Sequence, residues 1–239
     1  MDTGPELSIS LLPTCVLSRA GGEVVVPLRV QRLLALLALS HDRPLTRAHV
    51  AGSLWPDTTS SRAFSSLRST LRGLRSLDPL VRVDVESVRL SPEVHVDWVE
   101  AVDHARRILD DDTRVPALRA VQLLRRGLLT DWCEEWLDAE QHSFLQLRVH
   151  ALETLCLQLS QDGRHALAVE AGLAAVACEP LRESAHRALI RAHLAEGNHF
   201  DAMAQFRRFE RDLRTELGLS PGPGVTRLLP GCSPVTAPS

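Results

Sequence analysis

Residues 60–77 read SSRAFSSLRSTLRGLRSL, and this stretch decides the fold that the sequence predicts. At about 100° per residue, its apolar side chains fall on one face of a helix, namely those of Phe64, Leu67, Leu71 and Leu74. No acidic residue interrupts the stretch, and its other faces carry the arginines Arg62, Arg68, Arg72 and Arg75. The spacing therefore predicts an amphipathic helix that packs on a core and presents guanidinium groups to an anionic partner.

Short hydroxyl side chains stand between these arginines, namely those of Ser65, Ser66 and Ser69. Arginine bonds guanine edges or phosphates through two parallel N–H groups, and serine approaches closely as donor or acceptor. We expect Ser65, Ser66, Ser69 and Arg72 to meet base edges in a DNA major groove. The alternative at this point is an ordinary solvated helix face.

Two shorter helices precede this stretch. Residues 28–41 carry an apolar stripe of helical period. Thr46 suits the N-cap of a second helix that runs to Trp55, and Leu45 and Val50 stand at the two positions of a hydrophobic staple. The sequence therefore predicts three consecutive helices.

Patterns typical of strands flank the three helices. Residues 80–90 alternate valine with charged residues, and residues 7–26 contain short apolar runs separated by proline and a glycine pair. Strands, three helices and a hairpin follow one another in a winged helix-turn-helix, whose third helix enters the major groove. Arg82 and Arg89 lie one on each predicted hairpin strand, where they are suited to the DNA backbone or the minor groove.

The second half of the chain contains an internal repeat. Gly-Arg-His at 163–165 recurs as Gly-Asn-His at 197–199, an offset of 34 residues, which is the tetratricopeptide period. Both glycines suit the left-handed position that ends a helix. Helices over 98–109, 116–129 and 134–160 are expected to complete the stack, and a plain helical bundle is the alternative. The predicted fold is mainly α, with a winged helix followed by tetratricopeptide-like helices.

Charge divides between the two halves. All 27 basic residues are arginine, and up to residue 96 there are 11 arginines against 9 acids, a net charge of +2. From residue 97 onward 16 arginines meet 21 acids, a net charge of −5. A positive first half suits nucleic acid and an acidic second half suits protein contacts. No apolar run reaches spanning length or resembles a signal sequence, so we expect a cytoplasmic protein without a membrane partner.

Motifs of catalysis and of cofactor binding are absent from the sequence. The five cysteines are widely spaced and predict reduced thiols, and no cysteine or histidine pair has the spacing of a zinc site. No phosphate-binding glycine loop or nucleophile elbow occurs. We therefore expect no metal, no cofactor and no enzymatic activity.

Two stretches of the sequence resemble the domains of a known protein family. The run LRVQRLLALLALSHDRPLTRAHVAGSLWPD, followed by RAFSSLRSTLRGLRSL, resembles the OmpR-type winged helix of the Streptomyces antibiotic regulatory protein (SARP) family, also called the AfsR family. Residues from DWCEEWLDAEQH to RTELGLSP resemble the bacterial transcriptional activator domain that follows it there. The resemblance implies a DNA-binding domain over residues 1–95 and an activator domain over 96–229. Residues 230–239 are rich in turn formers and are expected to be a disordered tail.

The resemblance also implies a function. Members bind direct repeats in promoters of secondary-metabolite gene clusters and recruit RNA polymerase, and a homodimer on the DNA fits such repeats. Arg68 and Arg75 match the arginines of the family's LRxxLxxLR run, where they are suited to clamping phosphates. The loop that touches polymerase in OmpR-type proteins corresponds here to Pro56, Asp57, Thr58, Thr59, Ser60 and Ser61.

One residue departs from the family pattern. The third helix has Arg72-Gly73 where relatives commonly carry an arginine and an aromatic residue, and glycine costs a helix about 1 kcal/mol relative to alanine. The rival hypothesis is therefore a protein-interaction adaptor whose helical repeats bind a partner and whose winged helix does not bind DNA.

Overall fold

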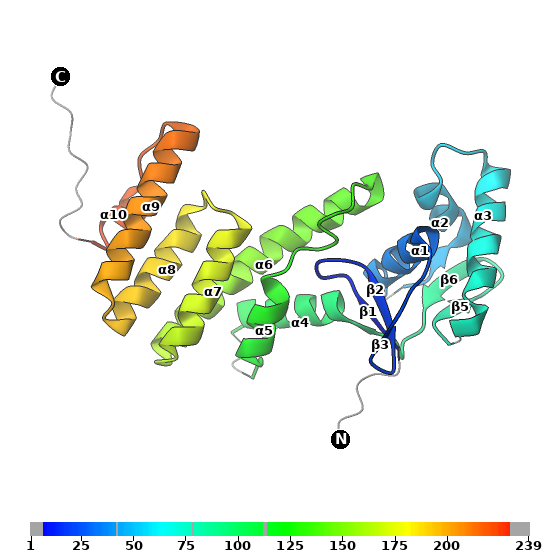
Figure 1. Ribbon diagram of the computed structural model, residues 1–239, viewed down its shortest axis with the longest axis horizontal. Coiled ribbons are helices and arrows are strands. Elements are labelled where there is room, and N and C mark those ends of the chain that lie inside the picture. Colours follow the sequence, from blue (N-terminus) through cyan, green and yellow to red (C-terminus); the bar gives the residue numbers. More distant parts are fainter. Residues whose placement is uncertain (1–6, 42, 78, 112–113, 230–239) are drawn as a thin grey trace. The chain divides into compact units, whose positions relative to one another are not determined.

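The computed structural model describes residues 7–41, 43–77, 79–111 and 114–229, so the predicted tail at 230–239 lies outside the described residues. The chain divides into two compact units, which Figure 1 shows together with their helices and strands. Unit 1 comprises residues 1–100 and 127–141, and unit 2 comprises residues 101–126 and 142–239. Helices α4 (Asp97–Leu109) and α6 (Glu135–Gln161) each begin in unit 1 and end in unit 2.

Unit 1 contains two small sheets. The first has the order β3-β2-β1-β7, in which β1 (Leu7–Ser10), β2 (Val16–Arg19) and β3 (Gly22–Val24) are antiparallel and β7 (His95–Val96) runs parallel to β1. The second has the order β4-β6-β5, with β4 (Leu45–Thr46), β5 (Val81–Val83) and β6 (Ser87–Leu90). The strands expected in 7–26 and 80–90 are therefore confirmed. The two-residue strands β4 and β7 are too short for a sequence pattern to reveal.

Three helices lie between these strands, as the sequence predicts. They are α1 (Leu28–Leu39), α2 (Arg47–Leu54) and α3 (Ser60–Gly73). The Thr46 hydroxyl accepts a hydrogen bond from the backbone N–H of His49 at 3.2 Å, and Leu45 and Val50 are both buried. Both the N-cap and the staple are thus confirmed. Helix α3 ends at Gly73 rather than at residue 77, because a 3₁₀ turn, η1 (Arg75–Leu77), replaces its last turn.

A buried carboxylate joins the start of α4 to the first sheet. Asp97 is 8% exposed and accepts hydrogen bonds from the Ser10 hydroxyl and from the backbone N–H groups of Leu11, at 2.7 Å, and Leu12, at 3.3 Å. The backbone of 127–141 adds to unit 1, since the N–H of Leu129 donates to the carbonyl of Leu11 at 3.0 Å. Residues 127–141, which lie within the predicted activator domain, therefore pack with unit 1.

Unit 2 is a row of helices, visible as α7, α8 and α9 in Figure 1. Its elements are α5 (Ala117–Leu124), α7 (His165–Cys178), α8 (Glu183–Glu196), α9 (His199–Leu217) and the short α10 (Pro223–Thr226). Gly163 and Gly197 have φ angles of 73° and 85°, the left-handed conformation predicted for both. Helix α5 ends five residues before the expected end at residue 129. The fold class, a small α+β region followed by a helical repeat, is confirmed.

Close packing and a terminal cap hold the repeat together. A Cβ atom on Gly172 of α7 would lie 3.0 Å from the Leu189 side chain of α8, so the two helices meet where a side chain is missing. After α9 the chain folds back, and Val225 and Leu229 bury their side chains in a cluster with Ile190, Ala202 and Phe206. A terminal repeat needs such a cover for its apolar face.

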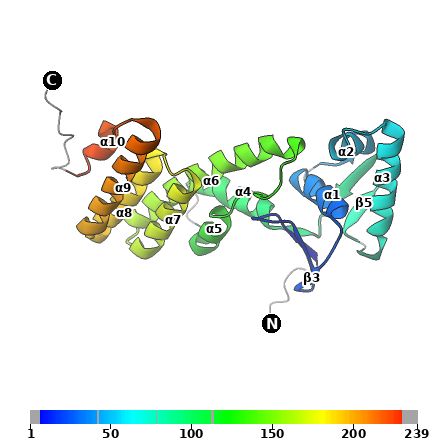
Figure 2. The same cartoon turned by 45° about the horizontal axis from the view of Figure 1, so that its top comes forward.

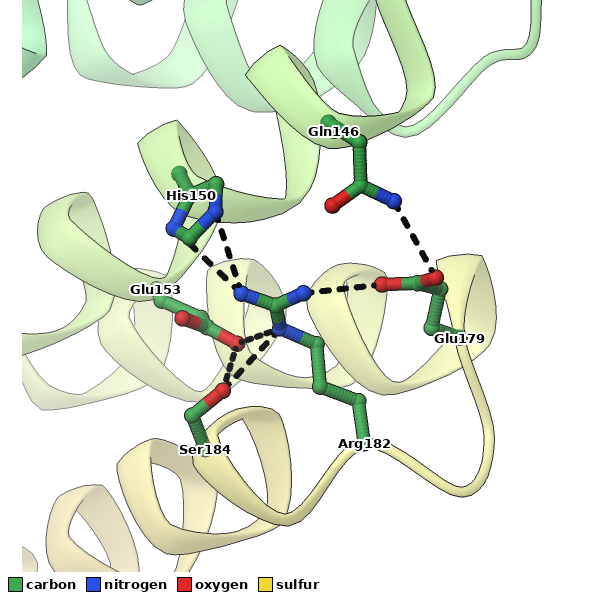
Figure 3. Close-up of polar contacts among 6 residues, drawn as sticks. All are labelled: Gln146, His150, Glu153, Glu179, Arg182 and Ser184. Atoms are coloured by element: carbon green, nitrogen blue, oxygen red, sulfur yellow. Dashed lines mark hydrogen bonds and ion pairs between the residues drawn. The ribbon is translucent and has the colours of Figure 1, made fainter. Parts of the chain in front are cut away.

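A polar cluster fixes the turn between α7 and α8 (Figure 3). The Arg182 guanidinium donates to Glu153 at 2.8 Å and to Glu179 at 3.0 Å. Further hydrogen bonds connect α6 and the start of α8 to this cluster, and they involve Gln146, His150 and Ser184. Because Glu153 belongs to α6, the cluster joins that helix to the turn.

His186 is expected to make the stability of unit 2 depend on pH. Its Nε2–H donates to the carbonyl of Pro180 at 2.8 Å, its Nδ1 accepts from Gln205 at 2.8 Å, and its ring stacks on Phe209 with centroids 4.1 Å apart. Burial is the main cause that lowers the pKa of His186, and the hydrogen bond to the Pro180 carbonyl and, after it, the Asp212 carboxylate oppose the shift more weakly. The folded protein therefore prefers the neutral imidazole.

We expect the free energy of unfolding to fall as the pH drops below about 6.5, because the unfolded histidine then binds a proton that the folded one resists. Urea unfolding between pH 5.5 and 7.5 measures this loss, and His186→Gln should flatten it. Equal pH slopes for the wild type and the variant would show that His186 is not responsible.

Candidate nucleic-acid interface

Helix α3 is rotated from the orientation that its apolar pattern predicts. Leu67 and Leu74 are buried as expected, but Phe64 and Leu71 are only half-buried. The other buried positions are Ala63, 3% exposed, and Thr70, 1% exposed. Thr70 tolerates burial because its hydroxyl donates to the carbonyl of Ser66 at 2.9 Å. The predicted core face is therefore wrong by part of a turn.

The rotation changes which polar side chains point outward. At about 100° per residue, Ser65, Arg68 and Arg72 lie opposite the buried face. The exposed members of the predicted site on this helix and on η1 are Arg62, Ser65, Arg68, Ser69, Arg72 and Arg75. Ser66 is half-buried and lies on the flank, so its side chain is displaced from the outward face.

A hollow of about 620 Å³ lies between α3 and strand β5. Its lining residues are Arg47, Arg68, Leu71, Arg72, Leu74, Arg75, Val81 and Val83. Four arginines thus line one concave surface together with four apolar side chains. A second hollow of about 500 Å³ shares Arg47 and Arg68 and reaches the hairpin turn at Val85 and Glu86.

Arg47 is the site residue that sequence reasoning missed. It begins α2, and its backbone N–H donates to the carbonyl of Glu86 in the hairpin turn at 2.9 Å. That bond brings the start of α2 to the hairpin and to α3. The only signal in the sequence is an arginine directly after the N-cap Thr46, which does not reveal a contact 39 residues away.

The arginines of the hollow are not neutralised by neighbouring acids. Arg68 Nη2 donates to the Ser65 hydroxyl at 3.1 Å. No carboxylate of a described residue forms an ion pair with Arg47, Arg62, Arg68, Arg72 or Arg75. An arrangement of unpaired guanidinium groups is suited to binding phosphate.

The two hairpin arginines lie elsewhere. Arg82 and Arg89 are directly opposite each other in the strand register. Val81 and Val83 line the hollow and Val88 and Leu90 are buried, so the arginines project from the other face of the hairpin. The structure therefore does not bring Arg82 and Arg89 together with the arginines of α3.

Arg82 already has an anionic partner. Its Nη2 lies 2.6 Å from an oxygen of Glu93. A hydrogen bond from Ser91 is the largest cause that lowers the pKa of Glu93, and the nearby Arg82 lowers it further. A phosphate at Arg82 must therefore compete with this carboxylate, although both side chains are exposed and such pairs are weak.

The loop before α3 is open to solvent. All six residues from Pro56 to Ser61 are exposed. The Thr58 hydroxyl donates to the carbonyl of Trp55 at 3.1 Å, and no side chain caps the N-terminus of α3.

Neither a metal-binding cluster nor a membrane-spanning helix occurs within the described ranges. There, no group of three or more histidine, cysteine or acidic side chains is arranged to hold a metal ion. Cys15, Cys133, Cys156 and Cys178 are free thiols, whereas Cys232 lies outside the described residues. None of the described helices combines the length and apolarity needed to cross a bilayer.

Comparisons with known proteins agree with this architecture. Residues 97–230 match the family model of the bacterial transcriptional activator domain. Over 209 residues the chain is 32% identical to the regulatory protein AfsR of Streptomyces coelicolor, covering 82% of this chain and 21% of AfsR. It therefore spans about a fifth of that relative's length.

A solved structure shares the fold. Mycobacterium tuberculosis EmbR, in complex with a low-affinity phosphopeptide, superimposes with a TM-score of 0.69 over 93% of this chain and 64% of the EmbR chain, at 22% identity. The matched activator domain, which covers more than half of the chain, and the likeness to AfsR mean that the chain belongs to the SARP/AfsR family of transcriptional regulators.

Proposed function

We propose that this protein is a sequence-specific DNA-binding activator that binds direct repeats in promoters of a secondary-metabolite gene cluster and recruits RNA polymerase. The observation that carries the proposal is the hollow beside α3, which four arginines line without a described carboxylate partner. Such a surface releases condensed counterions from a duplex, which is the main source of affinity for DNA.

The residues of the site have different roles in DNA binding, according to their positions. Arg47, Arg68 and Arg75 surround the hollow and clamp phosphates. Arg72 lies on the outward face of α3 and reads a base edge. Ser65 and Ser69 flank it as short donors or acceptors, and Ser66 contributes less because it is half-buried.

The hairpin acts separately in this proposal. Arg82 and Arg89 project from the hairpin face that points away from the hollow. They therefore reach the DNA backbone or the minor groove beside the DNA strand that α3 binds. Their contribution to affinity is smaller than that of the hollow, since Glu93 competes for Arg82.

The rest of the chain supplies the activator function. Residues 1–95 act as the DNA-binding domain, residues 96–229 as the activator domain, and the exposed loop from Pro56 to Ser61 contacts polymerase. Two copies occupy a direct repeat as a homodimer when the half-site centres lie about 10 to 10.5 base pairs apart, or a multiple of that.

Titration of the purified protein against its own upstream DNA at several salt concentrations tests the proposal. We expect sharp retardation of the tandem-repeat DNA at physiological salt. Absence of retardation at every salt concentration would instead favour the adaptor, in which the helical repeats bind a partner and the winged helix does not bind DNA.

Arg47 provides a specific prediction within the same assay. Arg47→Ala should lower the affinity for all DNA sequences and reduce the log–log salt slope by about 0.9, because one phosphate contact is lost. Arg29→Ala is the matched control, since Arg29 is exposed on α1 and does not line the hollow. Equal slopes for Arg47→Ala and Arg29→Ala would remove Arg47 from the interface.

A further inference from the structure

A second concave surface of unit 1 lies between α2 and the start of α6. It encloses about 460 Å³ and is lined by His49, Gly52, Ser53, Pro56, Glu134, Glu135 and Trp136. Figure 2 shows α2, with the first turns of α6 on the side away from α3. We call this surface the tryptophan notch. It is not part of the arginine-lined hollow, with which it shares no lining residue.

The indole in the notch is held in a fixed orientation. Trp136 Nε1 donates to Glu134 at 3.1 Å, and the same Glu134 oxygen lies 2.5 Å from Arg32 Nη2. Arg32 and Glu134 are 24% and 23% exposed, so this ion pair is partly shielded from water. An aromatic side chain that is already fixed loses little conformational entropy when a partner packs on it.

The notch is also negatively charged. Residues 131–140 contain five acids and no basic residue. Glu134 is neutralised by Arg32, but no described residue forms an ion pair with Glu135, which is exposed. His49 also lines the notch from α2 and is exposed.

The opposite wall leaves room for an incoming side chain. Gly52 is exposed on α2, and no atom lies within 4 Å of the place where its Cβ would be. Pro56, at the edge of the notch, is also the first residue of the loop that we assign to polymerase contact. The notch and the loop therefore form one continuous surface.

We propose that the tryptophan notch receives an arginine side chain from a basic segment of RNA polymerase. A guanidinium group stacks on an indole and pairs with a carboxylate at the same time, and the notch offers Trp136 and Glu135 for these two contacts. This inference rests on the proposed function and adds a specific docking point to it.

Binding of RNA polymerase holoenzyme from the source bacterium to the immobilised full chain tests the inference without DNA. Glu135→Gln removes the unpaired charge, and Gly52→Leu fills the notch without changing any charge. Each is expected to weaken holoenzyme binding by at least about fivefold. Glu140→Gln is the matched control, an exposed acid on the same helix outside the notch, and should change binding by less than about twofold.

Salt dependence and DNA retardation complete the test. The difference between wild type and Glu135→Gln should shrink at 1 M salt, where charge contacts are screened. All three variants should retard promoter DNA as the wild type does. Unchanged holoenzyme binding by both notch variants overturns the inference alone, whereas no holoenzyme binding by the wild type overturns it together with the proposed recruitment of polymerase. Loss of DNA retardation by the wild type overturns the proposed function instead.

Discussion

Arg72→Ala is expected to lower the affinity for the promoter repeat by about 5- to 150-fold, which corresponds to about 1 to 3 kcal/mol for one lost base-edge contact. The side chain lies on the outward face of α3, lines the arginine-rich hollow and has no ion pair with a described carboxylate. It is therefore available to DNA without first breaking a contact inside the protein. Fluorescence anisotropy with the specific repeat and with a scrambled duplex measures the effect.

The affinities of the variants for specific and scrambled DNA distinguish a base contact from a phosphate contact. Arg72→Ala should relax the preference at one base position while changing the affinity for scrambled DNA much less. Arg68→Ala should weaken both duplexes about equally and reduce the salt slope by about 0.9. If Arg72→Ala weakened specific and scrambled DNA to the same extent, its role would be a phosphate contact.

Phe209→Ala is expected to destabilise unit 2 by about 3 to 5 kcal/mol. The Phe209 side chain is 0% exposed and stacks on the buried His186 ring, so its removal leaves a cavity in the α8–α9 interface and an unsupported imidazole. Urea unfolding of the full chain, followed by circular dichroism, gives the loss as a shift of the helical transition.

Phe200→Ala is the matched control on the same helix. Phe200 is 80% exposed, and surface substitutions change stability by less than about 0.5 kcal/mol. Similar losses for the two variants would mean that the interior of unit 2 is not packed around Phe209.

Local features of the fold were predictable from the sequence. The Thr46 N-cap, the staple of Leu45 and Val50 and the left-handed glycines at 163 and 197 each depend on a few neighbouring residues, and all are confirmed. The same holds for the hairpin over 80–90, because alternation of apolar and charged residues is a local signal.

Features set by distant contacts were not predictable. The orientation of α3 depends on Ala63 and Thr70, which a hydrophobicity pattern does not rank as core residues. The position of Arg47 follows from a hydrogen bond to Glu86, and the face of Arg82 and Arg89 follows from burial of Val88 and Leu90. Sequence reasoning named most of the guanidinium groups of the site, but not which of them share a surface.

The salt dependence of binding to the tandem-repeat promoter tests the central claim most directly. Three arginines around the hollow, Arg47, Arg68 and Arg75, each replace the counterion of one phosphate, which predicts a slope of log K against log salt of about −2.7 per protomer. Exposed Arg62 and the hairpin arginines can make the slope steeper by up to about 2.7. A slope near zero, or no binding at any salt concentration, would contradict the account.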